Sequence, residues 1–283
     1  MSRRAAVTSA GPPGLPAASR TVSRAGVRHG ESLSGVRVLA EETAVAFTYD
    51  FTTQAVMMAT PRDLEDFAVG FSLTEGLIGD VAEIESLDIA VQDLGVDVRI
   101  GLSSARKDAF VARRRHMAGP VGCGLCGIES LAEARRSLPR VTPEPRFTAG
   151  QVAEALSALT PAQVLNAETR AVHAAGFWRP AQGLVALRED VGRHNALDKL
   201  VGALARAGEG PGDKDADGLL LLTSRVSIEM VQKAAVLGAP VIVAVSAPSA
   251  LAVEAADEAN ITLAAIARAD GFEVFTHRRR LAL

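Results

Sequence analysis

The chain has 283 residues, of which 48% are hydrophobic and 22% charged, as is usual for a globular protein. A formal net charge of -3 excludes the strongly basic composition typical of nucleic-acid-binding proteins, so no nucleic acid is expected as a partner. No apolar run reaches the ~18–20 residues of a membrane span, and no apolar leader is visible, so we expect a cytoplasmic protein without a membrane partner.

The first part of the chain is expected to hold a tail and a small domain. Residues 1–30 carry five arginines, no acidic residue and many small residues, which predicts a disordered tail. Thr60 and Pro61 are typical of a helix N-terminus, and apolar residues follow them at helical spacing. Residues 31–118 are therefore expected to form a small α+β domain. Its strands are predicted at residues 36–39, 43–49, 55–59, 84–91 and 97–102.

A glycine-rich stretch at residues 119–126 holds both cysteines of the chain, Cys123 and Cys126. Good helix formers follow from Ile128, so the thiols lie just before a helix start, whose partial positive charge lowers the pKa of a thiol. The neighbouring glycines leave room for a bulky partner. Four interpretations stay open from these residues alone: a structural disulfide, a zinc site completed by a histidine, a thioredoxin-like redox pair, and a cysteine that carries a persulfide.

The second half of the chain alternates between strands and amphipathic helices from residue 184 onward. This alternation predicts βαβ units, a largely parallel sheet and a three-layer α/β/α sandwich. The strands are predicted at residues 184–188, 219–222, 240–245, 262–267 and 273–276, and a further helix at 149–158. His173, a lone histidine among alanines, is expected to be packed rather than catalytic.

Three strand-to-helix junctions should gather at one edge of this sheet, at residues 189–195, 223–227 and 246–249. Ligands bind at the carboxyl ends of the strands in open α/β sheets. The polar residues at these junctions are therefore our candidates for ligand binding: Arg193, His194, Asn195, Thr223, Ser224, Arg225 and Ser246.

Several of these stretches resemble the FdhD/NarQ family. The matching stretches are residues 59–71, 123–127, 172–175, 188–199, 223–233 and 246–253, in the family's order. The chain departs from the family's usual residues at Ala265 and Ile266, where the family has Gly-Phe, and at Arg170 and Ala171, where it has glycine or small residues.

The resemblance implies an accessory sulfurtransferase of formate dehydrogenase. Such a protein takes sulfur from a cysteine desulfurase as a persulfide. It passes the sulfur to the molybdenum (or tungsten) bis-molybdopterin guanine dinucleotide cofactor, which then enters the formate dehydrogenase apoenzyme. Cys123 would carry the persulfide, and Cys126 would attack or shuttle it. The family also implies a cytidine-deaminase-like domain, here residues 119–283, and a homodimer.

The resemblance places further cofactor contacts in the segment before the last strand. These residues are Ile266, Ala267, Arg268, Ala269, Asp270 and Gly271. Arg193, Arg225 and Arg268 would suit the phosphates of the guanine dinucleotides. Glu189 and Asp198 would pair guanine N–H groups or hold these arginines.

Two other functions are considered. One is a zinc-dependent hydrolase of the deaminase type, against which the absence of an H-x-E sequence counts. The other is a non-catalytic chaperone that binds the molybdenum cofactor without carrying sulfur. No resident metal is expected, because two cysteines without that sequence leave too few ligands for zinc.

Overall fold

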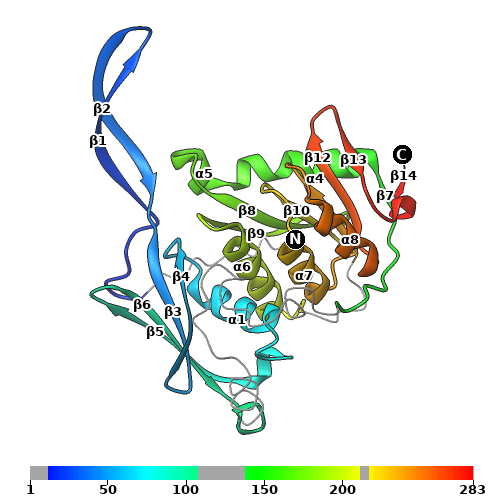
Figure 1. Cartoon of the computed structure of the whole chain (residues 1–283), viewed down its shortest axis with the longest axis horizontal. Helices are drawn as coiled ribbons and strands as arrows, with labels where there is room; N and C mark the ends of the chain where they lie inside the picture. Colours follow the sequence, from blue (N-terminus) through cyan, green and yellow to red (C-terminus); the bar gives the residue numbers. More distant parts are fainter. Residues whose placement is uncertain (1–11, 108–137, 211–216, 283) are drawn as a thin grey trace.

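The computed structural model describes residues 12–107, 138–210 and 217–282 (Figure 1). Cys123 and Cys126 lie outside the described residues, as do the junction of the two expected domains and the helix expected from Ile128. Within the described part of the chain, no helix combines the length and the apolar character that a membrane span requires.

The larger sheet has six strands in the order β13-β12-β11-β10-β8-β9. They are β8 (His173–Arg179), β9 (Gly183–Asp190), β10 (Leu219–Leu222), β11 (Val241–Ala244), β12 (Thr262–Arg268) and β13 (Gly271–Val274). β10, β11 and β12 pair in parallel, and β8 lies antiparallel between β9 and β10, so β9 runs in the same direction as the parallel strands. The predicted largely parallel sheet is therefore confirmed for β9, β10, β11 and β12, whereas β13 and the unpredicted strand β8 run the other way.

The sequence pattern does not predict β8. Its residues include two alanines and a glycine, which are poor strand formers. However, β8 pairs with β9 as an antiparallel hairpin and with β10 on its other side, and five of its residues are buried. Pairing and burial therefore outweigh the weak local propensity of this segment.

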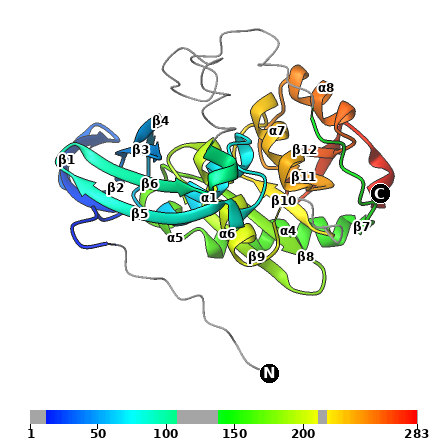
Figure 2. The same ribbon diagram turned by 90° about the horizontal axis from the view of Figure 1, so that it is seen from below.

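Helices cover both faces of the six-stranded sheet (Figure 2). One face packs against α6 (Arg193–Arg206), α7 (Ile228–Leu237) and α8 (Ala250–Glu258), and the other against α4 (Ala149–Ala162). Successive side chains of a strand face opposite sides, so Leu220 joins the first core and Leu221 the second. The likeness to cytidine deaminases stays a prediction.

Local signals set the ends of these helices. Thr148 and Gln151 form a capping box, so α4 begins at the predicted residue, although it continues beyond the predicted end. Gly238 ends α7 in the left-handed conformation that glycine tolerates. The remaining elements of this half are short: β7 (Phe147–Thr148), α5 (Val164–Thr169), the 3₁₀ turn η2 (Arg278–Arg280) and β14 (Leu281–Ala282).

A second sheet, in the first part of the chain, has the strand order β4-β3-β6-β5. Its elements are β3 (Thr43–Tyr49), β4 (Thr52–Ala59), the helix α1 (Leu64–Thr74), the 3₁₀ turn η1 (Val81–Glu83), β5 (Ile84–Gln92) and β6 (Gly95–Leu102). The four predicted strands of this sheet are confirmed, and β3 has the predicted ends. The helix begins later than predicted, after Asp63, because Thr60 binds the second half of the chain instead of capping α1.

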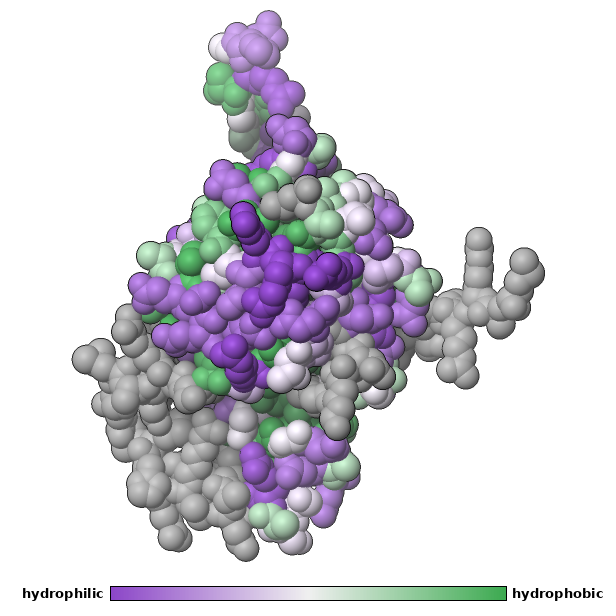
Figure 3. Space-filling model, turned by 90° about the vertical axis from the view of Figure 1, so that its right-hand side faces the viewer, coloured by the Kyte–Doolittle hydropathy of each residue, from purple (hydrophilic) through white to green (hydrophobic). Residues whose placement is uncertain are grey.

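A two-stranded arm projects from the body of the protein (Figures 1 and 3). It consists of β1 (Ser19–Arg28) and β2 (Glu31–Ala40), which pair antiparallel along their whole length. The prediction of a disordered tail is therefore wrong for Ser19–Arg28. Composition alone misses this strand, because the partner strand β2 satisfies its backbone hydrogen bonds.

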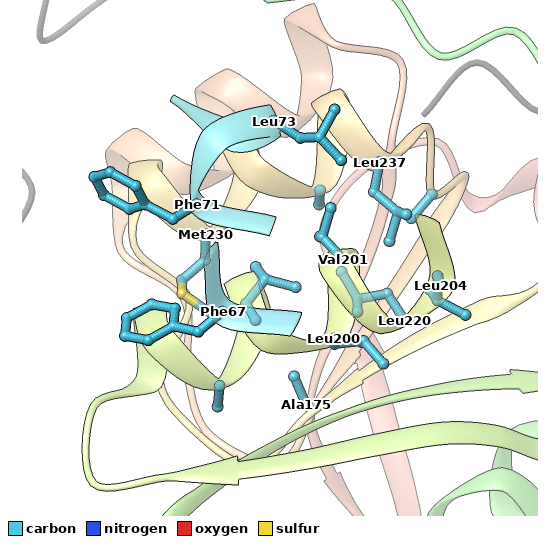
Figure 4. Close-up of a cluster of buried hydrophobic side chains, with 14 of the residues drawn as sticks. Phe67, Phe71, Leu73, Ala175, Leu200, Val201, Leu204, Leu220, Met230 and Leu237 are labelled. Atoms are coloured by element: carbon cyan, nitrogen blue, oxygen red, sulfur yellow. The ribbon is translucent and has the colours of Figure 1, made fainter. Parts of the chain in front are cut away.

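The two parts of the chain share one hydrophobic core (Figure 4). α1 lies between the four-stranded sheet and α6, where Phe47 stacks on Phe71 with the ring centroids 4.7 Å apart. Where α1 and α6 cross, the helices touch through glycine. A Cβ added to Gly70 would lie 1.7 Å from the carbonyl oxygen of Asp198, and one added to Gly202 would lie 1.8 Å from that of Asp66.

Candidate functional site

The carboxyl ends of β9, β10, β11 and β12 lie along one edge of the six-stranded sheet, where three helices begin. Neighbouring junctions touch one another. His194 at the start of α6 lies 3.9 Å from the carboxylate of Glu229 at the start of α7. Val226 forms a bridge to Pro248, and the N–H of Ile266 donates to the carbonyl of Ser246. The predicted gathering of these junctions is confirmed, and it forms what we term the carboxyl edge.

A buried polar cluster at the first junction binds other parts of the chain. Asp190 accepts hydrogen bonds from Lys199 (2.5 Å), from the backbone of Thr60 (3.0 Å) and from the side chain of Asn195 (2.9 Å). Asn195 also donates to the carbonyl of Met58, and Lys199 to that of Thr60. These contacts fasten the end of β4 to the start of α6. Asn195, a candidate for ligand binding, is thus a buried structural residue.

The two carboxylates expected near the guanine groups also face the interior. Asp198 is fully buried and binds Lys233 and the hydroxyl of Thr74. Glu189 accepts hydrogen bonds from the backbone N–H groups of Leu165 and Asn166, at the start of α5. Both carboxylates therefore have internal partners, and within the described residues these partners do not include Arg193, Arg225 or Arg268. Their pairing with guanine stays a prediction.

Unpaired polar atoms remain at the carboxyl edge. Among the described residues, no atom lies within hydrogen-bond distance of three buried atoms, Arg193 Nε, His194 Nε2 and Ser227 Oγ, although the carboxylate of Glu229 lies just beyond that distance from His194. They come from two adjacent junctions, the first turn of α6 and the N-cap of α7. Because buried polar atoms are rarely left unpaired, these three are suited to a polar ligand that supplies their missing partners.

The charges around these atoms are well defined. His194 and Ser227 beside Glu229 lower the pKa of this carboxyl to about 2, so it is ionised at neutral pH. Burial lowers the pKa of His173, and the positive charge of Arg193 adds to this effect. His173 opens β8 and is half-buried, so the expectation of a packed histidine holds only in part. Sequence reasoning did not select Ser227 or Glu229, although they lie only two and four positions after Arg225, at the start of α7.

The other candidate residues differ in what they present to solvent. Arg225 is exposed, whereas Ser224 is buried and donates to the carbonyl of Arg225. The hydroxyl of Thr223 accepts a hydrogen bond from the N–H of Ala174 in β8, and the N–H of Thr223 donates to the carbonyl of Ala174. These bonds hold the ends of β8 and β10 together. Ser246 is half-buried, with its carbonyl paired to Ile266.

The segment from Ile266 to Gly271 bends away from regular strand geometry. Ile266 is 39% exposed and has a φ of 52°, which is rare for a β-branched residue, and the pairing register shifts beside it. Arg268 donates to the carbonyls of Ala267 and Val245, so part of its guanidinium holds the backbone. Ala269 and Asp270 are exposed in the turn before Gly271, and Ala267 is buried.

Within the described ranges, no group of three or more His, Cys, Asp or Glu side chains is arranged to hold a metal ion.

Comparison with known proteins identifies the family to which this chain belongs. The model of the FdhD/NarQ family matches residues 40–282, which is most of the chain. The chain belongs to the FdhD/NarQ family. It is 53% identical over 268 residues to the sulfur carrier protein FdhD of Agrobacterium fabrum, with 94% of this chain and 97% of the relative covered. It is 50% identical over 246 residues to the protein of the same name from Brucella abortus, with 87% and 90% covered.

A solved structure also resembles this FdhD/NarQ chain. It is the crystal structure of a protein from Desulfotalea psychrophila assigned as a formate dehydrogenase accessory protein. The two superpose with a TM-score of 0.74 at 23% identity, covering 94% of this chain and all of the other. At this identity the likeness establishes the fold alone.

Proposed function

We propose that the protein is a sulfur carrier that takes persulfide sulfur from a cysteine desulfurase and passes it to the molybdenum bis-molybdopterin guanine dinucleotide cofactor for formate dehydrogenase. The observation that carries this proposal is the 53% identity, over nearly the whole chain, to a relative named sulfur carrier protein. The cofactor is cargo here, not a resident group. Cys123 is the proposed carrier, with Cys126 as its relay.

The transfer to Cys123 needs no oxidant or reductant. The Cys123 thiolate attacks the outer sulfur of the persulfide on the desulfurase. A new S–S bond forms on Cys123 while the S–S bond of the desulfurase breaks, and the desulfurase cysteine leaves as a thiolate. The glycines beside Cys123 give the incoming cysteine steric access.

The carboxyl edge is suited to the nucleotide arms of the cargo. Helix N-termini carry partial positive charge and free N–H groups, and α6, α7 and α8 all begin there. Arg193 and His194 offer buried nitrogens that make no hydrogen bond within the described part of the chain, and Arg225 is an exposed cation. These groups complement a phosphate chemically, so the residues present fit a guanine dinucleotide.

We expect Cys123 to gain one sulfur atom when the protein is incubated with a cysteine desulfurase and free cysteine. Intact-mass spectrometry should detect the added sulfur, and treatment with a thiol reductant should remove it. The Cys123→Ala variant should show no stable addition. A wild-type protein that never gains sulfur would instead support a cofactor chaperone that carries none.

Guanosine diphosphate serves as a simple probe for one nucleotide arm. Arg225→Ala should weaken its binding about tenfold, because a hydrogen bond to a charged group contributes about 1.5 kcal/mol or more. Isothermal titration of wild type and variant measures this, with Arg140→Ala as the control, since Arg140 is an exposed arginine outside the carboxyl edge. Unchanged affinity in Arg193→Ala, Arg225→Ala and Arg268→Ala alike would place the nucleotide elsewhere.

A further inference from the structure

The turn between β9 and α6 carries two of the side chains proposed to bind the nucleotide, Arg193 and His194. Both are half-buried and belong to the first turn of the helix. Gly192 is the N-cap residue of α6 and has no side chain that could accept the free N–H groups of that turn. Contacts from outside the helix therefore fix the way in which this start is built.

A single buried carboxylate, that of Asp190, organises the turn. One of its oxygens accepts hydrogen bonds from within the turn, from the N–H of Gly192 (2.7 Å) and the side chain of Asn195 (2.9 Å). The other oxygen accepts from the N–H of Thr60 (3.0 Å) and from Lys199 (2.5 Å). Because each oxygen binds two donors, the carboxylate ties the turn on one side to Thr60 on the other.

Thr60 contacts this part of the chain with every polar group that it has. Beyond the bond from its N–H to Asp190, its carbonyl accepts from Lys199 at 2.8 Å, and its hydroxyl accepts from the N–H of Val191 at 3.2 Å. Thr60 is fully buried and directly follows β4. Of the three bonds, only the one to the hydroxyl can be removed by a substitution that leaves the backbone unchanged.

We propose that Thr60 is a positioning residue of the nucleotide site, whose hydroxyl holds Val191 so that Arg193 and His194 are directed to the carboxyl edge. This inference rests on the proposed function, because it takes a nucleotide arm as the ligand of these two side chains. A turn that is already ordered loses less conformational entropy on binding, which raises the affinity. The four-stranded sheet thereby takes part in binding through the end of β4, although the groups that meet the ligand come from the second half of the chain.

Thr60→Val tests this role, because it removes the hydroxyl and keeps the volume and the branched shape of the side chain. We expect the dissociation constant of guanosine diphosphate, measured by isothermal titration of the full chain, to rise about fivefold, since the N–H of Val191 loses its partner and the turn becomes less ordered. Thr60→Ser keeps a hydroxyl and should bind like the wild type. Circular dichroism checks that each variant is folded at the temperature of the titration.

Thr276→Val is the matched control. Thr276 is also buried, and its hydroxyl also accepts a hydrogen bond from a backbone N–H, that of Leu263 at 2.9 Å. Leu263 lies near the start of β12, at the end of the sheet opposite to the carboxyl edge. This variant should be less stable in urea, yet bind guanosine diphosphate like the wild type. Equal losses of affinity in Thr60→Val and Thr276→Val would overturn the proposal, and so would an unchanged affinity in Thr60→Val or a failure of Thr60→Ser to restore binding.

A positioning residue must also act through the side chains that it positions. In an Arg193→Ala/His194→Ala background, Thr60→Val should therefore weaken binding no further, whereas its effect and that of Arg225→Ala at the neighbouring junction should add in free energy. An undiminished effect of Thr60→Val in the first background would overturn the proposal. A wild type that binds no guanosine diphosphate would overturn it together with the nucleotide site, while the sulfur-carrier role is decided separately by the mass of Cys123-loaded protein.

Discussion

A protein carrying Cys123→Ala should fold normally and leave formate dehydrogenase inactive. The reason is chemical, because sulfur transfer by exchange requires a thiolate, and alanine offers no atom to hold the sulfur. Activity measured in cells that lack the native gene and express the variant gives the readout, with circular dichroism of the purified variant as the check on folding. Full formate dehydrogenase activity in these cells would show that sulfur does not pass through Cys123.

Cys126→Ala is the matched control for this experiment. It removes a thiol from the same glycine-rich stretch, three positions after Cys123. If Cys126 only relays sulfur, its loss should lower activity less than the loss of Cys123. Equal loss in the two variants would mean that the thiols act together as a pair.

Gly70→Ala should lower the free energy of unfolding by ~3 kcal/mol or more. This is a large part of the about 5–15 kcal/mol that is typical of a folded protein. The added methyl group would lie 1.7 Å from the carbonyl oxygen of Asp198, which is backbone and cannot turn aside. α1 and α6 would have to separate, and the buried side chains that pack between these two helices would lose contact with one another. Urea unfolding followed by circular dichroism measures the loss.

Gly150→Ala provides the comparison for this change. Gly150 also lies in a helix, but a Cβ there would have its nearest neighbour at 3.7 Å, an ordinary contact. Alanine is the better helix former, so stability should stay the same or rise by up to about 1 kcal/mol. A similar loss of stability in both variants would indicate that close packing at the helix crossing is not the cause.

The sequence predicted those helices and strands that are specified by residues close to one another in the chain. β10 and β11 are runs of apolar residues followed by helix starts, and both appear as buried strands where expected. Residues 36–39 of the arm were predicted as a strand, but β1 and β8 were missed, since each depends on pairing with another strand, and small or polar residues hide this pairing in the sequence. The start of α1 was misplaced because Thr60 binds Asp190, 130 residues away.

The candidate site, too, could be predicted from the sequence only in part. The gathering of helix starts at the carboxyl edge follows from strand order and could be predicted. The direction in which each polar side chain points could not be predicted, because residues 189–199 contain groups at the carboxyl edge and interior groups in one uninterrupted run. His194 opens toward the edge, while Asn195, the next residue, is buried against β4. Only the position of the four-stranded sheet, which contacts Asn195 through β4, distinguishes these two residues.

The buried pairing of Thr60 with Asp190 and Lys199 has a consequence for synthesis. Contacts that close over 130 or more residues cannot form until the second half of the chain has left the ribosome. Until then α1 has no α6 to pack against, and its apolar face remains open to other nascent chains. Because ordering such distant contacts is slow, the interval between translation and completion of the core is the period in which this protein most needs a chaperone.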